Sequence, residues 1–268
     1  FVIFNLVSVR NPMLKWAYAK ERKMYERGSD IIFSFAGGID YLKRKHWTKS
    51  SGGKIDESRV HYINNGMSID DFDRNKVAYS LNDEDIENEY LFKIVYLGSI
   101  RLVNDVQQII DALSLLSDYK DICLFIYGNG DQRKRLVKYC EDREISNVVF
   151  KQECIPLSHV PYVMSHSNLN ILNYQKGFGD YGISSGKLFQ SLAAGKPIVC
   201  NVNIAYDDII TDNQLGIAGG LNTPRKYADA ILKIYHLDKE NYDRMCGLVR
   251  EVAKRFDFEV LSKQYFTK

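Results

Sequence analysis

The feature that most constrains the fold is an alternation that begins at Lys93, where short runs of β-branched and aromatic residues alternate with segments of helical hydrophobic spacing. The run 93–97 ends at Gly98, and apolar residues then recur at helical intervals through 106–116. Such alternation is typical of a parallel sheet whose strands are joined by crossover helices. The sequence therefore predicts an α/β fold with a doubly wound, Rossmann-like parallel sheet over residues 93–255.

The rest of this region continues the pattern. Further strands are predicted at 122–127, 148–150, 169–172 and 198–200, and helices at 131–143, 158–165, 186–194, 223–236 and 240–254. Asp131 is expected to cap the helix that follows it, and Gly195 to end the helix before it.

The chain before Lys93 has a different character. Helices are predicted at 12–27 and 39–46 and strands at 30–34 and 60–63, whereas the acidic stretch 70–89 has few apolar residues and is interpreted as an inter-domain linker. We divide the chain into a remnant of an N-terminal domain (1–68), a linker (69–92), a Rossmann-like domain (93–255) and a final helix (256–268). Because the chain begins with Phe1 instead of Met, we expect that part of the natural protein precedes it.

Composition narrows the cellular setting. The formal charge of +2 gives no reason to expect nucleic acid as the main partner. The five cysteines are an odd number without a C-x-x-C pair, which favours reduced thiols in the cytoplasm. No apolar run approaches the roughly 18 residues of a membrane helix. We expect a cytoplasmic protein, with the inner face of the plasma membrane as one place for it.

The histidines and the nucleophile motifs carry little signal. The five histidines lack a metal-ligand spacing, so neither a bound metal nor another cofactor is expected. Because the chain lacks a G-x-S-x-G motif, a hydrolase that uses a nucleophilic serine is poorly supported.

The most informative candidate segment is 180–190, which passes from a loop into the start of a predicted helix. Ligands of doubly wound sheets bind beyond the carboxyl ends of the strands, where this segment lies. Ser184, Ser185 and the ammonium of Lys187 could converge there with free N–H groups on one anion. The alternative is that Lys187 is a solvated surface lysine; Arg101, after the first strand, is open to the same two interpretations.

Several segments in this order resemble the group 1 (family 4) glycosyltransferases of the GT-B fold, which build bacterial surface polysaccharides. The similar passages are 94–99 with the helix ending 109–113, the glycine turn 125–130, and the helix-to-strand passage 187–199. Residues 63–67 with Phe72 are similar to the hinge of that family, and 256–259 to the start of its final helix. The resemblance implies a complete C-terminal nucleotide-sugar domain and a partial N-terminal acceptor domain.

The chain departs from the family pattern at the residues expected to hold the donor. Gln190 stands in place of the second glutamate of a conserved pair, and Gly182 falls near the first, with Asp180 the nearest carboxylate. Asn104 replaces a frequent lysine, which leaves Arg101 as the nearest cation.

The resemblance implies a sugar donor linked to a nucleotide diphosphate, UDP being expected, and a glycan or polyprenyl-linked acceptor, with retention of configuration in capsule or lipopolysaccharide synthesis. The enzyme would be of the hexosyl or N-acetylhexosaminyl type. Asp180, Lys187 and Arg101 are the expected catalytic residues. The expected donor-binding residues are Gly98, Ser99, Tyr127, Gly128, Lys151, Tyr181, Gly182, Ser184, Ser185 and Gln190.

Two other classes of function stay open. One is a non-catalytic subunit that binds nucleotide or glycan, and the other is a different GT-B enzyme such as a nucleotide-sugar epimerase. Without the rest of an acceptor domain, we expect this chain to bind a nucleotide diphosphate but not to transfer sugar.

The predicted helix 12–27 has its own two interpretations. It carries Lys15, Lys20, Arg22, Lys23 and Arg27 beside Trp16, Tyr18 and Tyr25. This composition suits peripheral association with an anionic bilayer. A solvated helix that packs on the acceptor domain would have the same composition.

Overall fold

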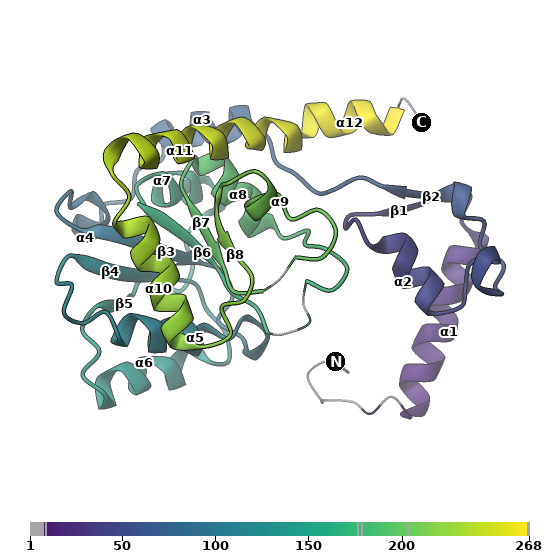
Figure 1. Ribbon diagram of the computed structural model, residues 1–268, viewed down its shortest axis with the longest axis horizontal. Helices are drawn as coiled ribbons and strands as arrows, with labels where there is room; N and C mark the ends of the chain where they lie inside the picture. Colours follow the sequence, from purple (N-terminus) through teal and green to yellow (C-terminus); the bar gives the residue numbers. More distant parts are fainter. Residues whose placement is uncertain (1–7, 9, 176, 178, 203, 267–268) are drawn as a thin grey trace.

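The computed structural model describes residues 8–266 except 9, 176, 178 and 203. Figure 1 shows a larger body, which follows residue 63, and a smaller N-terminal body, made of residues 10–63, beside it. In the described chain, no helix has both the length and the apolar character needed to cross a bilayer.

The larger body is built on a six-stranded parallel sheet. Its strands are β3 (Phe92–Leu97), β4 (Ile122–Tyr127), β5 (Val148–Phe150), β6 (Leu169–Leu172), β7 (Ile198–Cys200) and β8 (Gly216–Ala218). They lie in the order β5-β4-β3-β6-β7-β8. The predicted α/β class with a doubly wound sheet is confirmed. The edge strand β8 was not predicted, because three residues beginning with Gly216 carry no periodic signal.

Helices cover both faces of this sheet (Figure 1). They are α5 (Val106–Ser114), α6 (Arg133–Asp142), α7 (Val160–Ser165), α8 (Gly186–Ala194), α9 (Ile209–Asp212), α10 (Pro224–Tyr235) and α11 (Lys239–Ala253). Ile94 and Tyr96 of β3 pack with α5, α6 and α10, whereas Val95 packs with α7 on the opposite face. The faces differ because successive side chains of a strand point to opposite sides.

One predicted cap is wrong. Helix α6 begins at Arg133 after Gln132, and no side chain caps it. The chain is still turning at Asp131, because Gly130 has a φ of 159° and its carbonyl accepts the Arg133 N–H at 3.1 Å. Gly195 does end α8 as expected, in the left-handed conformation.

The N-terminal body contains the four elements predicted for it. These are α1 (Pro12–Arg27), β1 (Ile31–Phe33), α2 (Gly38–Arg44) and β2 (Val60–Tyr62), and the two strands pair in parallel. Its core is small and consists of Ile31, Phe33, Leu42, Trp47 and Ile55.

The acidic stretch expected to be a linker is folded onto the larger body. It forms α3 (Ile69–Ala78) and α4 (Glu84–Glu87), and α3 packs against α7. Phe72 and Ile86 are 2% and 0% exposed, so two well-placed apolar side chains anchor a segment that is otherwise polar. The Lys93 ammonium donates to the Ile86 carbonyl at 2.9 Å and ties α4 to β3.

The C-terminal helix α12 (Phe258–Phe266) runs from the larger body toward the N-terminal body (Figure 1). Its start is fixed by Met67, whose N–H donates to the Phe256 carbonyl and whose carbonyl accepts from Phe258, both at 3.0 Å. Near its end, Tyr265 and Phe266 line a pocket with residues of the β1–β2 sheet. The predicted final helix therefore lies where the two bodies meet, although residues 267–268 are outside the described chain.

Candidate functional site

The strand order places a topological switch point between β3 and β6. From β3 the chain proceeds outward to β4 and β5, and it then returns to β6 on the other side of β3. The loops after β3 and β6 therefore diverge at the carboxyl edge of the sheet, which is where doubly wound sheets bind ligands.

Two glycine turns are packed back to back at this edge. Gly98 follows β3 and its N–H donates to the Tyr127 carbonyl at 2.9 Å, while the Ile100 N–H donates to Asn129 at 2.8 Å. Gly128 has a φ of 137°, and a Cβ at that position would lie 1.9 Å from the Gly98 oxygen. Only glycine fits at Gly128, so the close approach of the two turns is built into the sequence.

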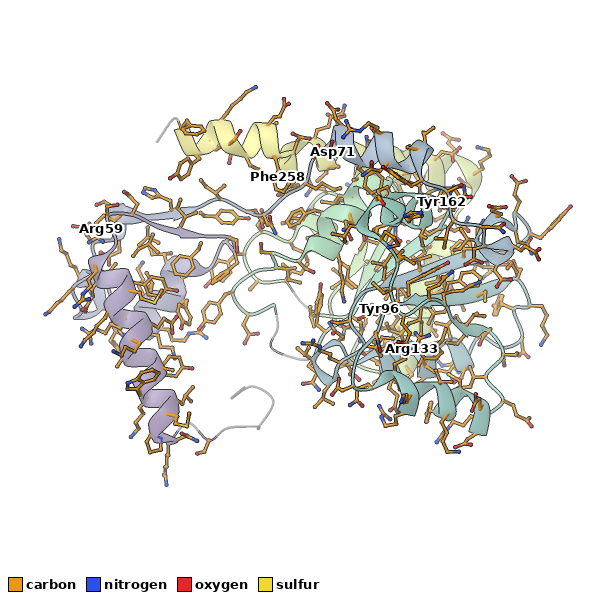
Figure 2. The ribbon with its side chains drawn as sticks, turned by 180° about the vertical axis from the view of Figure 1, so that it is seen from behind. Arg59, Asp71, Tyr96, Arg133, Tyr162 and Phe258 are labelled. Atoms are coloured by element: carbon orange, nitrogen blue, oxygen red, sulfur yellow. The ribbon has the colours of Figure 1, made fainter. Side chains whose placement is uncertain are left out.

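Lys187 points into the space beside the first turn. Its ammonium donates to the Tyr96 hydroxyl at 2.9 Å and lies 4.6 Å from the centre of that ring. A Cβ on Gly98 would come within 2.6 Å of the Lys187 Nζ. Figure 2 shows Tyr96 inside the larger body. The lysine is thus not the solvated surface residue of the alternative interpretation.

The environment of Lys187 disfavours its charge. Burial lowers the pKa of its ammonium to about 8, and among the described residues no carboxylate forms an ion pair with it. It also lies in the first turn of α8, where the helix macrodipole repels a cation. A bound anion would remove both penalties.

Two serines precede Lys187 at the entrance to α8. Ser185 is the N-cap residue, and its side chain makes no capping hydrogen bond but hydrogen-bonds with the Tyr174 side chain. The Ser184 hydroxyl is buried and has no partner in the described chain. Ser184, Ser185 and Lys187 are the donors that the sequence singled out at this helix start.

Other predicted residues of this loop lie beside the N-terminal body. The Tyr181 ring contacts Tyr41 edge-on at 5.4 Å, and the Arg44 guanidinium lies 4.9 Å from the Tyr181 ring. The Gly37 N–H donates to the Tyr181 carbonyl at 2.8 Å. Gly182 turns the loop with a φ of 100°. The loop that leads into α8 therefore contacts α2 of the N-terminal body through Tyr181.

Asp180 is exposed and borders a polar pocket of about 420 Å³, which Asp105, Gln108 and Asn201 also line. Burial raises the pKa of the Asp105 carboxyl. Among the described residues, no group of three His, Cys, Asp or Glu side chains could hold a metal ion.

Two predicted side chains point away from this edge. The Tyr127 hydroxyl donates to Asp83 at 2.8 Å, and the Lys151 ammonium donates to Asp83 and Asp85 at 2.6 and 2.5 Å. Although burial opposes charge on Lys151 and Asp83, their mutual hydrogen bond raises the pKa of the lysine and lowers that of the aspartate. The side chains of Tyr127 and Lys151 are therefore held by Asp83 and do not take the place expected for them.

The remaining predicted residues are spread around the edge. Arg101 is exposed in the loop after β3. The Ser99 hydroxyl donates to the buried Asn104 side chain at 2.9 Å, so it orders that loop. Gln190 borders a different pocket, of about 200 Å³, with Phe72 and Phe258. The structure therefore brings Gly98 and Lys187 together but places Gln190 elsewhere.

Sequence reasoning missed Arg133, which joins the two loops next to the site. Its guanidinium donates to the Gly128 carbonyl at 2.9 Å and to the Lys151 carbonyl at 2.6 Å. It also lies 3.5 Å from the Glu153 carboxylate, which accepts from Asn129 at 2.7 Å. The sequence did hold a signal for Arg133. It is a cation in the first turn of α6, where the helix macrodipole disfavours positive charge, as it does at Lys187 in α8.

Comparison with known proteins covers most of the chain. Residues 82–247 match the family of group 1 glycosyl transferases. TuaH of Bacillus subtilis, named for a glycosyltransferase role in teichuronic acid biosynthesis, is 27% identical over 196 residues, which are 73% of this chain and 45% of TuaH. The uncharacterized glycosyltransferase MJ1069 of Methanocaldococcus jannaschii is 24% identical over 206 residues, 75% of this chain and 49% of MJ1069. The chain thus spans about half the length of these relatives.

Solved structures share the fold at low sequence identity. Anabaena HepE in complex with UDP has a TM-score of 0.74 and 14% identity, over 98% of this chain and 69% of HepE. WaaG, a glycosyltransferase of lipopolysaccharide biosynthesis, has a TM-score of 0.70 and 17% identity, over 95% of this chain and 67% of WaaG. These likenesses confirm that the architecture is that of GT-B glycosyltransferases.

Proposed function

This chain belongs to the group 1 glycosyl transferases, and we propose that it binds a UDP-linked sugar at the carboxyl edge of its sheet. In the whole protein the sugar would pass, with retention of configuration, to a glycan or lipid-linked acceptor of a cell-surface polysaccharide. The observation that carries the proposal is the partly buried Lys187 ammonium, which has no carboxylate partner among the described residues and lies at the start of α8 beside Gly98.

The chemical task is to stabilise negative charge on a departing nucleoside diphosphate. A preorganised cation and a helix N-terminus in a partly desolvated site can do this without a metal ion. In our proposal Lys187, Ser184 and Ser185 bind the diphosphate, and Arg101 reaches it from the loop after β3. Asp180, the backbone of Tyr181 and Gly182 would face the sugar.

The nucleotide base would lie against the backbone of the loops after β4 and β5. This differs from the sequence-based expectation, because the side chains of Tyr127 and Lys151 are committed to Asp83. Gln190 was expected among the donor-binding residues, but it borders a pocket with Phe258, and we leave it out of the proposed site.

The relatives support the choice of donor and pathway class. HepE has been solved with UDP and glucose, and TarM of S. aureus with UDP and α-GlcNAc-glycerol. TuaH is named for biosynthesis of teichuronic acid. A UDP donor and a surface glycan are therefore the first to be tested.

The decisive experiment is titration of UDP and GDP into the chain and into Lys187→Ala. Loss of one charge-assisted hydrogen bond of about 1.5–3 kcal/mol should weaken UDP binding by roughly 10- to 100-fold. In the full-length enzyme the mutation should cost on the order of 2–4 kcal/mol in transition-state stabilisation. Equal affinity and equal turnover for the two proteins would mean that the diphosphate binds elsewhere.

Lys226→Ala is a matched control for this experiment. Lys226 lies in the first turn of α10 and is exposed, but the Thr223 side chain caps that helix. Its removal should leave UDP affinity unchanged. Product analysis with the full-length protein separates transfer from epimerisation, since an epimerase releases an altered nucleotide sugar and needs no acceptor.

A further inference from the structure

The Tyr96 hydroxyl has a fixed orientation below the carboxyl edge of the sheet. Tyr96 is 0% exposed, and its O–H donates to the Ser99 carbonyl at 2.7 Å. Because a phenol has only one proton, its oxygen faces Lys187 as an acceptor and takes a hydrogen bond from the ammonium at 2.9 Å. The Ser99 carbonyl thus determines that Tyr96 accepts from the lysine and does not donate to it.

Tyr174, in the loop after β6, supplies a second ring. It is 2% exposed, and the Lys187 ammonium lies 5.8 Å from the centre of its ring. At this distance a cation is attracted by the negative face of an aromatic ring. The same ammonium lies 4.6 Å from the centre of the Tyr96 ring. Two buried phenols therefore adjoin the ammonium, and we call Tyr96 and Tyr174 the tyrosine pair.

Tyr174 is held in place from the next strand and from α8. The Asn201 side chain, after β7, accepts from the Tyr174 N–H at 2.9 Å and donates to the Tyr174 carbonyl at 2.7 Å. Asn201 also donates to Gln108 of α5 at 3.0 Å. The Tyr174 side chain hydrogen-bonds with Ser185, the N-cap residue of α8. Its ring is therefore fixed relative to the helix that carries Lys187.

The groups that titrate around the Lys187 ammonium are all neutral acids. Burial lowers the pKa of Lys187, and no charged side chain of the described residues contributes to the shift. Tyr227 and the Cys200 thiol lie next to the tyrosine pair, and burial raises the pKa of all four groups above the usual pH range. A carboxylate in their place would stabilise the ammonium more strongly, but it would also repel an anion.

We propose that the tyrosine pair positions Lys187 for an anion. The Tyr96 oxygen fixes the direction of the ammonium and the Tyr174 ring stabilises its charge, and neither group carries a negative charge that would repel a diphosphate. Both are positioning residues, since they act through the lysine. Their ligand is the diphosphate of the proposed function, on which this role rests, whereas the protonation of Lys187 can be measured without any nucleotide.

The direct test is the protonation of Lys187 in the unliganded chain, followed by NMR of isotope-labelled lysine. The Cε resonance that is missing from Lys187→Ala belongs to this residue, and its titration midpoint is the quantity measured. Tyr96→Phe removes a hydrogen bond to the charged form and should lower the midpoint by about one pH unit. Tyr174→Leu removes the ring and should lower the midpoint by about half a pH unit, whereas Tyr174→Phe keeps the ring and should leave it unchanged.

Tyr227→Phe is the matched control. Tyr227 is 0% exposed, as Tyr96 is, but its hydroxyl has no hydrogen-bond partner in the part of the chain that the structure describes. Loss of this phenol oxygen should therefore leave the Lys187 midpoint unchanged. Thermal unfolding checks that each variant is folded.

Titration of UDP at two pH values connects the tyrosine pair to the proposed function. If only the charged lysine binds the diphosphate, a midpoint lowered by about one pH unit makes the affinity loss in Tyr96→Phe roughly fivefold greater at pH 8 than at pH 6. Tyr227→Phe should show no such difference. A purely structural role of Tyr96 would weaken UDP binding by the same factor at both pH values.

Two results would overturn the role of the tyrosine pair. One is a Lys187 midpoint that is the same in Tyr96→Phe, in Tyr174→Leu and in the unaltered chain. The other is a loss of UDP affinity in Tyr96→Phe that does not change with pH. A lowered midpoint in the two variants, without binding of UDP to the unaltered chain, would contradict the proposed ligand and still support the tyrosine pair as the partner of Lys187.

Discussion

The Lys187 ammonium and the Tyr96 hydroxyl are 2.9 Å apart across the carboxyl edge of the sheet, although 91 positions separate the residues in the sequence. The phenol is a neutral partner and leaves the positive charge of the lysine uncompensated. Burial raises the pKa of Tyr96, so this hydroxyl stays protonated throughout the usual pH range. The hydrogen bond therefore holds the Lys187 ammonium in place and leaves its positive charge available to an anion.

A first prediction is that UDP binding takes up protons near pH 8. Because burial lowers the pKa of Lys187 to about 8, about half of the free protein carries a neutral lysine at that pH. A bound diphosphate favours the ammonium and so raises its pKa. Titration calorimetry in two buffers of different ionisation enthalpy should give different heats for the unaltered chain and equal heats for Lys187→Met. Equal heats for the unaltered chain would contradict the prediction.

Lys187 should also reduce the stability of the unliganded chain. Its folded pKa of about 8 lies below the ordinary 10.5, so the charged form is disfavoured in the folded state. Between these pH values the unfolded chain binds more protons, and the free energy of unfolding contributed by this group therefore rises with pH. Below pH 8 Lys187→Met should stabilise the chain by up to about 3 kcal/mol. Urea unfolding at pH 7 measures this, with Lys226→Met as the control; a destabilised Lys187→Met chain would refute it.

Arg133 is predicted to position the two loops that receive the base. Its guanidinium holds the Gly128 and Lys151 carbonyls and is 12% exposed. In Arg133→Met both loops lose the donor that they share. UDP should therefore bind roughly tenfold more weakly, a loss of about 1–2 kcal/mol in binding free energy. Inorganic pyrophosphate has no base and should bind with unchanged affinity.

Arg135→Met is the control for this prediction, because Arg135 is exposed on the same helix and donates to Gln132 and Gln107. It should leave both affinities unchanged. A parallel loss of UDP and pyrophosphate binding in Arg133→Met would show general damage to the site instead of altered loops.

Asp83 is predicted to attach the acidic N-terminal flank to the larger body. Its side chain is 6% exposed and accepts from Lys151 and Tyr127. Asp83→Asn should lower the free energy of unfolding by about 3 kcal/mol. This value is at the lower end of the range for breaking a buried ion pair, because Asp85 still binds Lys151 in the variant. Denaturant titration measures the change. The exposed Asp118, mutated to Asn, should change stability by less than about 0.5 kcal/mol.

The same carboxylate gives a pH dependence. Although burial opposes its charge, hydrogen bonds from Lys151 and Tyr127 lower the pKa of Asp83. Its contribution to stability is therefore complete above the ordinary pKa of an aspartate. That contribution is lost as the pH falls through the lower pKa that Asp83 has in the folded chain. Stability of the unaltered chain should decline more steeply on acidification than that of Asp83→Asn. Identical acid profiles for the two proteins would argue against this role.

Local pattern was enough to predict most elements and to single out Lys187 as the principal candidate site residue. Strands β3, β4, β6 and β7 are mainly apolar runs, with Lys93 in β3 and Asn170 in β6 as exceptions, because parallel strands buried on both faces need such residues. Lys187 stood out in the sequence because the helix macrodipole disfavours a cation in the first turn of a helix. Parallel strands also imply that their carboxyl ends share an edge, so the place of the site followed from the fold class.

The tertiary structure decided which side chains reach that place. Tyr127 and Lys151 follow their strands as predicted, but their partner Asp83 lies 44 and 68 positions away, in a segment that the sequence presented as a linker. Arg133 likewise joins loops after two different strands. Hydrophobic periodicity shows which residues are buried along one element, because it reflects that element's own geometry. It contains no information on which distant polar group satisfies a given donor, since only the packed chain brings the two together.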